Sequence, residues 1–541
     1  MPRKIALYLS LIAISLFCYA NSLHGAFVSD DLAAVVENPH ISQFFNAWIN
    51  PQHLFNFLSY KAAGFHPLPY HLISVLLHSI NTILVFVFLS LFFKGPASFL
   101  GACLFAVHPI HTEAVCWVSG RPYLTTALFI FITYFLYHRA VNPRQKNKPF
   151  SLLPYLFSLG FFAYYMIINY PFFSLFIFLP MLIDLTLGKG MKNWRFWLPF
   201  ILIALIRLIL AQNALTQRLF LMKEQVIFPS ANPIFYFVYS FYNNLWLLLW
   251  PAKLTFYHEP ITFPPSLLNY SLLYLLPVIA ALIFFFKKAK ELFLALAIFI
   301  IFLAPTYSPT PISFIVAERY VYFPSIASSI VFAFIYQKGL AKLPKLKPYL
   351  LALLILVIAT YGLRTIVRNR DWQNAERFWE KTVKVSPKSI RAHTNLGLIY
   401  AQKGDTVQAL KEYNRAIEIE PNFSIAYNNR GNVYAGLGNL EQALSDYNSA
   451  IEINPNDAEA YANRGNIYAK MGNLEQAMSD YNKSIAANPG YGKAYNNRAI
   501  VYFMQKEYNK SWKDVLEAEK LQCQIYPSFR EAVKQAAGIT E

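Results

Sequence analysis

The chain has 541 residues, of which 56% are hydrophobic and 17% aromatic, and its 14% of charged residues is about half the fraction usual in soluble proteins. This composition excludes a chain built only of soluble domains. Residues 1–367 hold 25 Lys and Arg against 9 Asp and Glu, whereas residues 368–541 hold 22 against 20. The basic excess therefore lies in the apolar part, where it fits cytoplasmic loops better than a nucleic-acid-binding surface, and we expect no nucleic-acid partner.

Twelve apolar runs in the first two thirds of the chain are candidates for crossing about 30 Å of hydrocarbon. The first run follows Arg3 and Lys4 without a small-residue cleavage site, so we expect a retained helix rather than a signal peptide. The aromatic run at 233–250 is expected to lie at the interface or to re-enter, which leaves about eleven spans. The runs are 5–20, 69–93, 97–118, 122–138, 150–168, 171–187, 195–211, 233–250, 269–286, 291–307, 322–337 and 348–366.

The basic residues of the loops predict how these spans are oriented across the membrane. With eleven spans and a cytoplasmic N-terminus, 17 of the 25 basic residues fall in cytoplasmic loops, as the positive-inside rule requires. The same topology leaves only Asp184 and Glu291 of the nine acids inside. The sequence therefore predicts an integral, multi-pass membrane protein with a polar cavity and its chemistry on the outer face, periplasmic, extracellular or lumenal.

The first outer loop, residues 21–41, contains the doublet Asp30-Asp31 close to the end of the first span. Adjacent carboxylates near an apolar boundary raise one another's pKa and can act as a general base for a hydroxyl or as metal ligands. The alternative is a capped helix start in a solvated loop, because Asp and Ser favour N-caps.

The histidine segment, residues 104–121, places His108, His111 and Glu113 inside an apolar run that ends at Arg121. Polar groups this close to the membrane core are costly and indicate a functional site. The alternative is a hydrogen-bond network that fixes a helix end. Two histidines three residues apart can ligate a metal, but without HExxH or a matching Cys we predict no metal site.

The proline-rich loop, residues 304–325, ends in Glu318-Arg319. An arginine at the mouth of a cavity can hold a phosphate through paired hydrogen bonds, although Glu318 and Arg319 could instead pair with each other. Arg207, inside an apolar run, is a weaker candidate for the same task and could snorkel to the interface.

The last third of the chain repeats with a period of 34 residues. Stacked units of this kind bury a core that no single unit closes. The recurring positions are Pro387, Pro421, Pro455 and Pro489; Gly397, Gly431, Gly465 and Ala499; Tyr400, Tyr434, Tyr468 and Tyr502; and Ala409, Ala443 and Ala477. This pattern resembles tetratricopeptide repeats, and on their geometry the groove should present amides that can bind an extended peptide, those of Asn428, Asn432, Asn466 and Asn496. The alternative is that these asparagines are solvated helix positions without a ligand.

We therefore expect an all-α fold with four parts: a polytopic membrane domain at 1–367, a connecting half-repeat at 368–389, tetratricopeptide repeats at 390–525 and a C-terminal tail or capping helix at 526–541. The four cysteines are scattered without paired spacing, so disulfides and thiolate metal sites are not predicted. Glycine-rich nucleotide loops and the GxSxG elbow are absent, which disfavours nucleotide-driven transport, dinucleotide chemistry and serine hydrolysis.

The motifs FVSDDLAAVVENPHI, FHPLPYHLISVLLHSINTILV, LFAVHPIHTEAVCWVSGR, WPAKLTFYH and AERYVYFPS, in this order and followed by the repeats, resemble the transmembrane and tetratricopeptide repeat-containing O-mannosyltransferases and their prokaryotic relatives. The resemblance covers nearly the whole chain. It implies the GT-C membrane fold of the protein O-mannosyltransferases, and transfer of a sugar from a polyprenyl phosphate to Ser or Thr hydroxyls on the outer or lumenal face.

Carried onto this sequence, the resemblance makes Asp30 and Asp31 the family's acidic pair, His108, His111, Glu113 and Arg121 its second motif, and Glu318 and Arg319 its third. One departure stands out. Where relatives usually show Lys-Glu, this chain has Asn169 and Tyr170. If that lysine contacts the lipid phosphate, then either Arg121, Arg207 or Arg319 replaces it, or the activity or the choice of donor has changed.

Our leading hypothesis is an inverting, membrane-embedded glycosyltransferase. Asp30, or less favourably Asp31, removes the proton of the acceptor hydroxyl, and Glu113 is a further catalytic residue of the site. The charge of an arginine stabilises the leaving lipid phosphate. The partners are then a lipid-linked sugar, an acceptor protein on the repeats and membrane lipids. No cofactor is required; a divalent cation could bind the acidic pair, but this branch of the fold does not imply one. The alternatives are a non-catalytic scaffold that recruits proteins through its repeats and, more weakly, a transporter or flippase.

Overall fold

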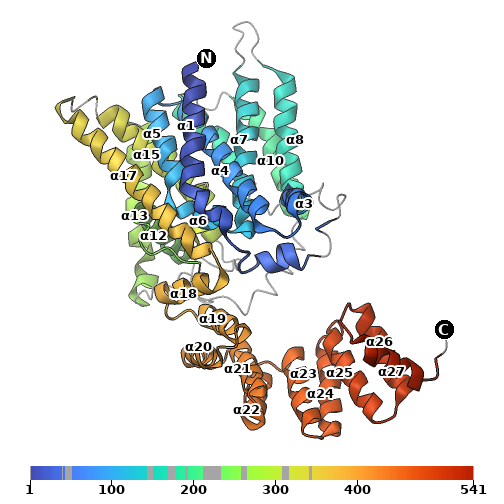
Figure 1. Cartoon of the computed structure of the whole chain (residues 1–541). Helices are drawn as coiled ribbons and strands as arrows, with labels where there is room; N and C mark the ends of the chain where they lie inside the picture. The colour runs from blue at the N-terminus through green and yellow to red at the C-terminus, as the bar shows by residue number, and fades with distance from the viewer. Residues whose placement is uncertain are drawn as a thin grey trace. The chain divides into compact units, whose positions relative to one another are not determined.

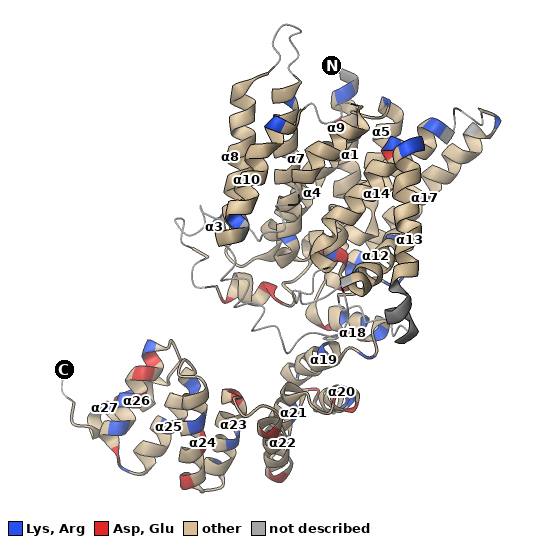
Figure 2. Cartoon of the chain, turned by 180° about the vertical axis from the view of Figure 1, so that it is seen from behind, with Lys and Arg blue, Asp and Glu red and all other residues tan. Residues whose placement is uncertain are grey.

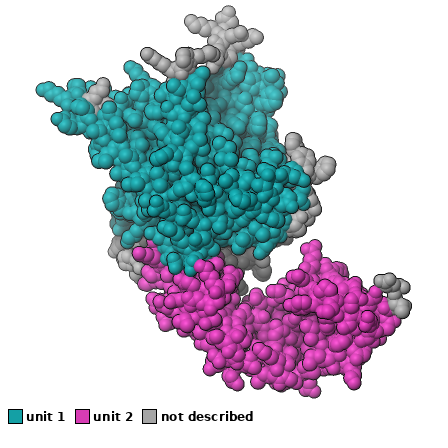
Figure 3. Space-filling view, in the orientation of Figure 1, with its two compact units in different colours: residues 1–381 teal, residues 382–541 magenta. Residues whose placement is uncertain are grey.

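Contacts divide the chain into two compact units, residues 1–381 and 382–541 (Figure 3). The boundary falls inside one helix, α18 (Ala375–Val385), within the segment expected to connect two domains. No β strand occurs among the described residues, and the all-α prediction is confirmed. The structure is a computed structural model that describes residues 2–38, 41–42, 51–142, 150–168, 175, 177–188, 193–210, 233–256, 265–307, 316–339, 341 and 344–539.

Unit 1 is a bundle in which helices from distant parts of the sequence lie side by side (Figure 1). Its helices are separated by prolines or short polar turns, and several carry a proline in their first turn, where it is tolerated. They are α1 (Pro2–Tyr19), α3 (Pro51–Ala63), α4 (Pro67–Leu89), α5 (Gly95–Val107), α6 (Thr112–Cys116), α7 (Arg121–Val141), α8 (Leu152–Ile168), α9 (Phe178–Thr186), α10 (Trp194–Leu210), α12 (Pro233–Leu249), α13 (Pro265–Lys288), α14 (Lys290–Phe302), α15 (Ile326–Phe334) and α17 (Lys347–Asn369).

Several of these helices suit a membrane. In the described part of the chain, four are long and apolar enough to cross one, and the pair formed by α5 with residues 109–116, bent by 47°, would make a fifth. A membrane protein is therefore supported, but the expected eleven spans are not confirmed. Several of the eleven runs form shorter or broken helices; the run at 150–168, for example, gives the 17-residue α8, shorter than the about 20 residues of a full span. The run at 233–250, not counted among the eleven, gives the 17-residue α12.

Glycine allows the closest helix crossing in unit 1. A Cβ atom on Gly101 of α5 would lie 2.7 Å from the Ser329 carbonyl oxygen of α15 and 2.8 Å from a methyl carbon of Leu89 in α4. These distances are shorter than van der Waals contact, so any side chain would force the three helices apart.

Unit 2 is a stack of helix pairs that confirms the predicted tetratricopeptide solenoid. The first helices of the pairs begin at residues 390, 424, 458 and 492, the boundaries predicted from the period. Figure 2 shows charged residues of both signs along these helices, whereas the helices of unit 1 carry few. The helices are α19 (Ile390–Gln402), α20 (Thr406–Ile419), α21 (Ser424–Gly436), α22 (Leu440–Ile453), α23 (Ala458–Lys470), α24 (Leu474–Ala487), α25 (Gly492–Met504), α26 (Tyr508–Lys520) and the final α27 (Pro527–Ala536).

The repeated glycine exists because a tyrosine ring packs on it. A Cβ atom on Gly397 would lie 2.7 Å from the ring of Tyr413, and one on Gly431 2.8 Å from the ring of Tyr447. The same contact recurs one period later. The two helices of each pair can therefore approach closely only if the first carries a very small residue at this place.

Arginines join neighbouring repeats at the same period. Arg464 of α23 donates Nε and Nη2 to the carboxylate of Asp480 in α24, both at 2.8 Å, and Nη1 to the Asn448 side chain of α22 at 2.7 Å. One guanidinium thus connects three helices. The equivalent sets are Arg430, Asp446 and Asn414, and Arg498, Asp514 and Asn482.

Replacing this arginine should weaken the stack. Arg464→Met leaves the largely buried Asp480 carboxylate without its bidentate partner, and we expect a loss of about 2 kcal/mol. Arg415→Met removes an exposed ion pair with Glu418 and should cost less than about 0.5 kcal/mol. Urea unfolding of the full chain, followed by hydrogen exchange in residues 458–520, measures both. Equal losses for the two variants would contradict this account of the stack.

Candidate functional site

The structure brings together the three segments singled out in the sequence of unit 1. Ser119 of the histidine segment donates to Asp31 of the first outer loop. Glu113 of the histidine segment forms an ion pair with Arg319 of the proline-rich loop. Residues separated by 200 positions or more in the sequence therefore share one cluster, with the histidine segment at its centre.

The two carboxylates of the acidic doublet have different surroundings. Asp31 is fully buried, and its carboxylate accepts hydrogen bonds from the backbone N–H and the hydroxyl of Ser119, each at 2.7 Å, and from the Val28 N–H at 3.3 Å. Burial raises the pKa of Asp31 from 3.8 to about 6, because the loss of hydration outweighs these donors. The bonds hold the first outer loop against the start of α7.

Asp30 faces the opposite way and is exposed. The residue before it, Ser29, has a φ of 54°, in the left-handed region that non-glycine residues seldom occupy. Its hydroxyl lies 3.3 Å from the Asp30 carboxylate. The strained backbone at Ser29 thus comes directly before a doublet in which Asp30 is exposed to solvent and Asp31 is buried.

The two histidines are enclosed and serve as hydrogen-bonding groups. His108 Nδ1 accepts from the Ile110 N–H at 3.2 Å, so its Nε2 carries the proton and donates to the Leu248 carbonyl at 3.0 Å. His111 Nε2 lies 2.7 Å from the hydroxyl of Ser325. These bonds break the helix at His108 and fix the bend. No group of three His, Cys, Asp or Glu side chains that could hold a metal occurs in the part of the chain that the structure describes.

Arg121 is fully buried at the start of α7. Its Nη1 donates to the Asn56 side chain at 2.8 Å, its Nη2 to the Tyr70 carbonyl at 2.9 Å and its Nε to the Ser74 hydroxyl at 3.4 Å. The guanidinium therefore ties α3, α4 and α7 together two residues beyond the anchor of Asp31. In this arrangement it reaches protein groups rather than solvent.

Two ion pairs form the deepest part of the cluster. Arg319 pairs with Glu113 through its guanidinium, and its backbone N–H donates to the second oxygen of the same carboxylate at 3.0 Å. Glu318, its neighbour, pairs instead with Arg368 at 3.2 Å. The alternative in which Glu318 and Arg319 pair with each other is wrong, because adjacent side chains in the short helix at 318–321 point in different directions. Burial raises the pKa of Glu318, while the charge of Arg368 opposes that shift.

Aromatic rings surround the Arg319 guanidinium. Its Cζ atom lies 5.4 Å from the ring centroid of Trp117, 5.3 Å from that of Phe256 and 5.0 Å from that of Tyr320. These cation–π contacts stabilise a charge that water does not reach.

Sequence reasoning missed two residues of this cluster at the end of α17. Arg368 bridges Glu318 and Asp371, and the Asn369 amide donates to the Cys18 carbonyl and to the Asn21 side chain, both at 2.8 Å. A charge at the end of an apolar run was the available signal, but residue 368 was taken as the start of the connecting segment.

Arg207 of α10 is half-buried. Its Nε donates at 2.8 Å to the carbonyl of Met166 in α8, three residues before Asn169 in the sequence. Asn169 and Tyr170 themselves, which stand where relatives carry Lys-Glu, lie outside the described residues.

The four asparagines predicted for the repeat groove differ in setting. Asn428 is buried and accepts from the Asn463 amide at 3.0 Å. Asn432 and Asn466 are exposed, and the carboxamide oxygen of each accepts from a tyrosine hydroxyl at 2.7 Å, that of Tyr447 or Tyr481. Because the oxygens are occupied, the NH2 groups are the ends free to bind a partner. Asn496 is half-buried.

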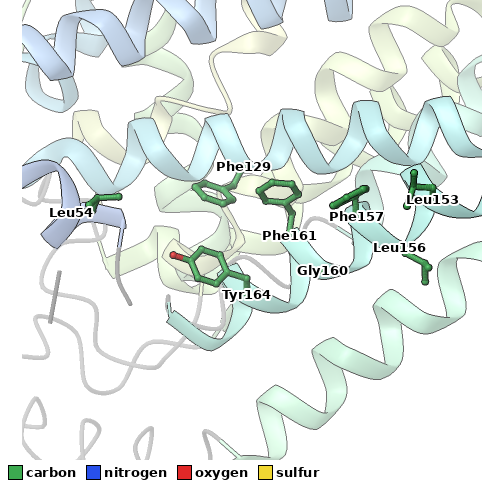
Figure 4. A pocket seen from close by; sticks show the side chains of 8 residues that line it. All are labelled: Leu54, Phe129, Leu153, Leu156, Phe157, Gly160, Phe161 and Tyr164. Atoms are coloured by element: carbon green, nitrogen blue, oxygen red, sulfur yellow. The ribbon is translucent and has the colours of Figure 1, made fainter. Parts of the chain in front are cut away.

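An apolar groove of about 630 Å³ runs along α8 between α7 and α3 (Figure 4). Apart from the Tyr164 hydroxyl its walls are hydrocarbon and aromatic rings. Leu54, at one end, is two residues from Asn56, the partner of Arg121. The lining residues are Leu54, Phe129, Leu153, Leu156, Phe157, Gly160, Phe161 and Tyr164.

Known proteins are similar to this chain both in its repeats and over about three quarters of its length. Tetratricopeptide-repeat models match residues 397–438, 432–472 and 458–491. The mouse protein O-mannosyl-transferase TMTC3 is 25% identical over 467 residues, covering 76% of this chain and 50% of its own. The human protein O-mannosyl-transferase TMTC4 is 25% identical over 489 residues, covering 74% of this chain and 64% of its own. The resemblance to the tetratricopeptide repeat-containing O-mannosyltransferases is confirmed.

The chain spans about half the length of TMTC3, the first of these relatives. Among solved structures, the tetratricopeptide protein TTC0263 of Thermus thermophilus is 20% identical, covers 34% of this chain and 95% of its own, and has a TM-score of 0.27.

The buried Asp31 predicts a pH dependence of stability. Since its pKa rises from 3.8 to about 6 on folding, the folded state binds the extra proton, and stability falls as the pH rises from about 4 to 6, by up to about 3 kcal/mol. Melting temperatures in detergent across this range should show the fall in the wild type and not in Asp31→Asn. Asp30→Asn, which removes the exposed neighbouring carboxylate, should keep the wild-type slope. The interpretation fails if Asp31→Asn keeps it too.

Proposed function

We propose that this chain is a membrane-embedded glycosyltransferase that moves mannose from a polyprenyl-phosphate donor to Ser or Thr hydroxyls of an acceptor protein on the outer face of the membrane. The names of the relatives support mannosyl transfer to protein. The observation that carries the proposal is the split acidic doublet: one carboxylate is anchored in the cluster, which leaves Asp30 exposed beside it.

In this reaction Asp30 is the general base. It takes the proton of the acceptor hydroxyl while that oxygen forms a bond to C1 of the sugar, and the bond from C1 to the phosphate oxygen breaks on the opposite side, with inversion. The bonding electrons leave with the polyprenyl phosphate. Atoms and charge balance without a cofactor, and the proposal includes none.

The leaving phosphate needs a positive charge close by. We assign this role to Arg207, because the guanidiniums of Arg121 and Arg319 are enclosed by protein partners whereas that of Arg207 is half-buried. Its bond to Met166 also places it close along the chain to Asn169, the position at which relatives carry a lysine. Arg207 would then replace that lysine.

The apolar groove on α8 suits the hydrocarbon chain of the donor. Its lining offers hydrocarbon and aromatic surface, and its end at Leu54 adjoins the Asn56–Arg121 contact beside the first outer loop. A polyprenyl chain lying in it would bring its phosphate toward the cluster.

The repeats would hold the acceptor. The NH2 groups of Asn432 and Asn466 are oriented outward by tyrosine hydroxyls, one repeat apart, and can donate to backbone carbonyls of an extended peptide. A protein-binding role fits tetratricopeptide repeats in either of our two hypotheses, so transfer itself distinguishes the enzyme from a scaffold.

Substituting the proposed base should abolish transfer. Asp30→Asn keeps the size of the side chain but cannot accept the proton, and we expect kcat to fall by at least about 100-fold. Glu37→Gln removes another exposed carboxylate of the same loop and should stay within about twofold of wild type. The assay follows labelled mannose from polyprenyl-phosphate mannose into protein in purified membranes. No transfer by the wild type, with partner binding retained, would favour the scaffold.

Removing a groove amide should weaken acceptor binding without affecting the chemistry. Asn466→Ala is expected to raise the KM for the acceptor by about tenfold at nearly constant kcat, because the lost donor contacts the bound peptide equally in the ground and transition states. Asn456→Ala, in an exposed turn between repeats, is the matched control. A fall in kcat at constant KM would show that the groove does more than collect the acceptor.

A further inference from the structure

The outer end of α17 contacts every part of the candidate cluster, although no motif of the sequence analysis includes it. Arg368 is 98% buried: its side chain donates Nη2 to Glu318 at 3.2 Å and Nη1 to Asp371 at 2.8 Å. A cation so enclosed is stable only while both carboxylates stay in place, and each carboxylate depends on the cation in the same way.

Arg368 holds Glu318, and Glu318 is the neighbour of Arg319, which pairs with Glu113. Glu318 and Arg319 are consecutive, so the backbone between them is held from two sides, by Arg368 on one residue and by Glu113 on the next. The Arg319 N–H, which donates to Glu113 at 3.0 Å, lies in that same backbone. A shift of Glu318 would therefore move the Arg319–Glu113 pair.

The next residues of the same segment hold the first outer loop. Asn369 donates to the Cys18 carbonyl and the Asn21 side chain at the end of α1 and accepts from the Cys116 thiol at 3.2 Å. The Gln373 carbonyl accepts from the Ala26 N–H at 2.9 Å, four residues before Asp30.

The loop packs closely on the residues that follow α17. A Cβ atom on Gly25 would lie 3.2 Å from the Trp372 carbonyl oxygen and 3.1 Å from that of Ser22. The loop backbone therefore rests directly on the segment that follows α17, and its position is set by that segment.

We propose that Arg368 and Asn369 are positioning residues for the transfer reaction, holding the first outer loop and the Glu318–Arg319 pair in register with the histidine segment. The proposal rests on the proposed function. Neither residue touches the substrate; each acts through the groups that it holds. Their loss should slow the chemical step and leave acceptor binding intact.

The test compares Arg368→Gln and Arg368→Lys with Arg364→Gln in the full chain. Arg364 lies one turn earlier on the same helix and bonds the carbonyls of Pro251 and Ala252, outside the cluster. For Arg368→Gln we expect kcat to fall at least about tenfold with the acceptor KM within about twofold, for Arg368→Lys a partial recovery, and for Arg364→Gln wild-type kinetics.

Hydrogen exchange supplies a readout independent of activity. Arg368→Gln should speed exchange in residues 25–37 and 316–325, and Arg364→Gln should not. Unchanged exchange there, or the same loss of kcat in Arg364→Gln, overturns the positioning role. If Arg368→Gln does not fold, Asn369→Ala, which removes no charge, is judged by the same criteria.

A wild type that transfers no sugar from any donor overturns the proposed function by itself, and with it the kinetic part of this proposal. The exchange comparison then decides the positioning alone.

Discussion

Ionisable groups in the apolar interior of unit 1 need charged or hydrogen-bonding partners, and the rest of the candidate site depends on that constraint. An isolated carboxylate or guanidinium buried this deeply would cost several kcal/mol. The cluster avoids that cost through ion pairs. Arg319 pairs with Glu113, and Arg368 pairs with both Glu318 and Asp371. Because Glu113 and Arg319, and Glu318 and Arg368, come from distant segments, pairing the charges also joins those segments.

The helices of the two units are held together by different kinds of contact. In unit 2 the repeated glycine, at 397, 431 and 465, receives a tyrosine ring from its own helix pair, so the packing is local and repeats every 34 residues. In unit 1 the buried ion pairs of the cluster join segments that are far apart in the sequence, and apolar side chains such as Leu202, Leu205 and Ile209 of α10 are exposed.

This difference explains how far the sequence could predict the structure. The repeat boundaries were predictable because a period of 34 reflects contacts between neighbours in the chain. The gathering of the segments that carry Asp31, Glu113 and Arg319 was also predictable, because polar groups are costly beside apolar runs. The pairing was not: adjacency favoured Glu318 with Arg319, whereas packing put Arg368 beside Glu318. Which of Asp30 and Asp31 is buried likewise depended on Ser119, 88 positions away, which no local pattern indicates.

The arginine contacts of unit 2 also bear on how its length can change. Each arginine bonds a carboxylate sixteen residues after it and an amide sixteen residues before it, as Arg464 does with Asp480 and Asn448. Duplicating or deleting one 34-residue unit keeps every such spacing, so the new junction forms the same bonds as the old ones. Arrays of this sequence can therefore lengthen or shorten in evolution by whole units, without compensating substitutions at the seams.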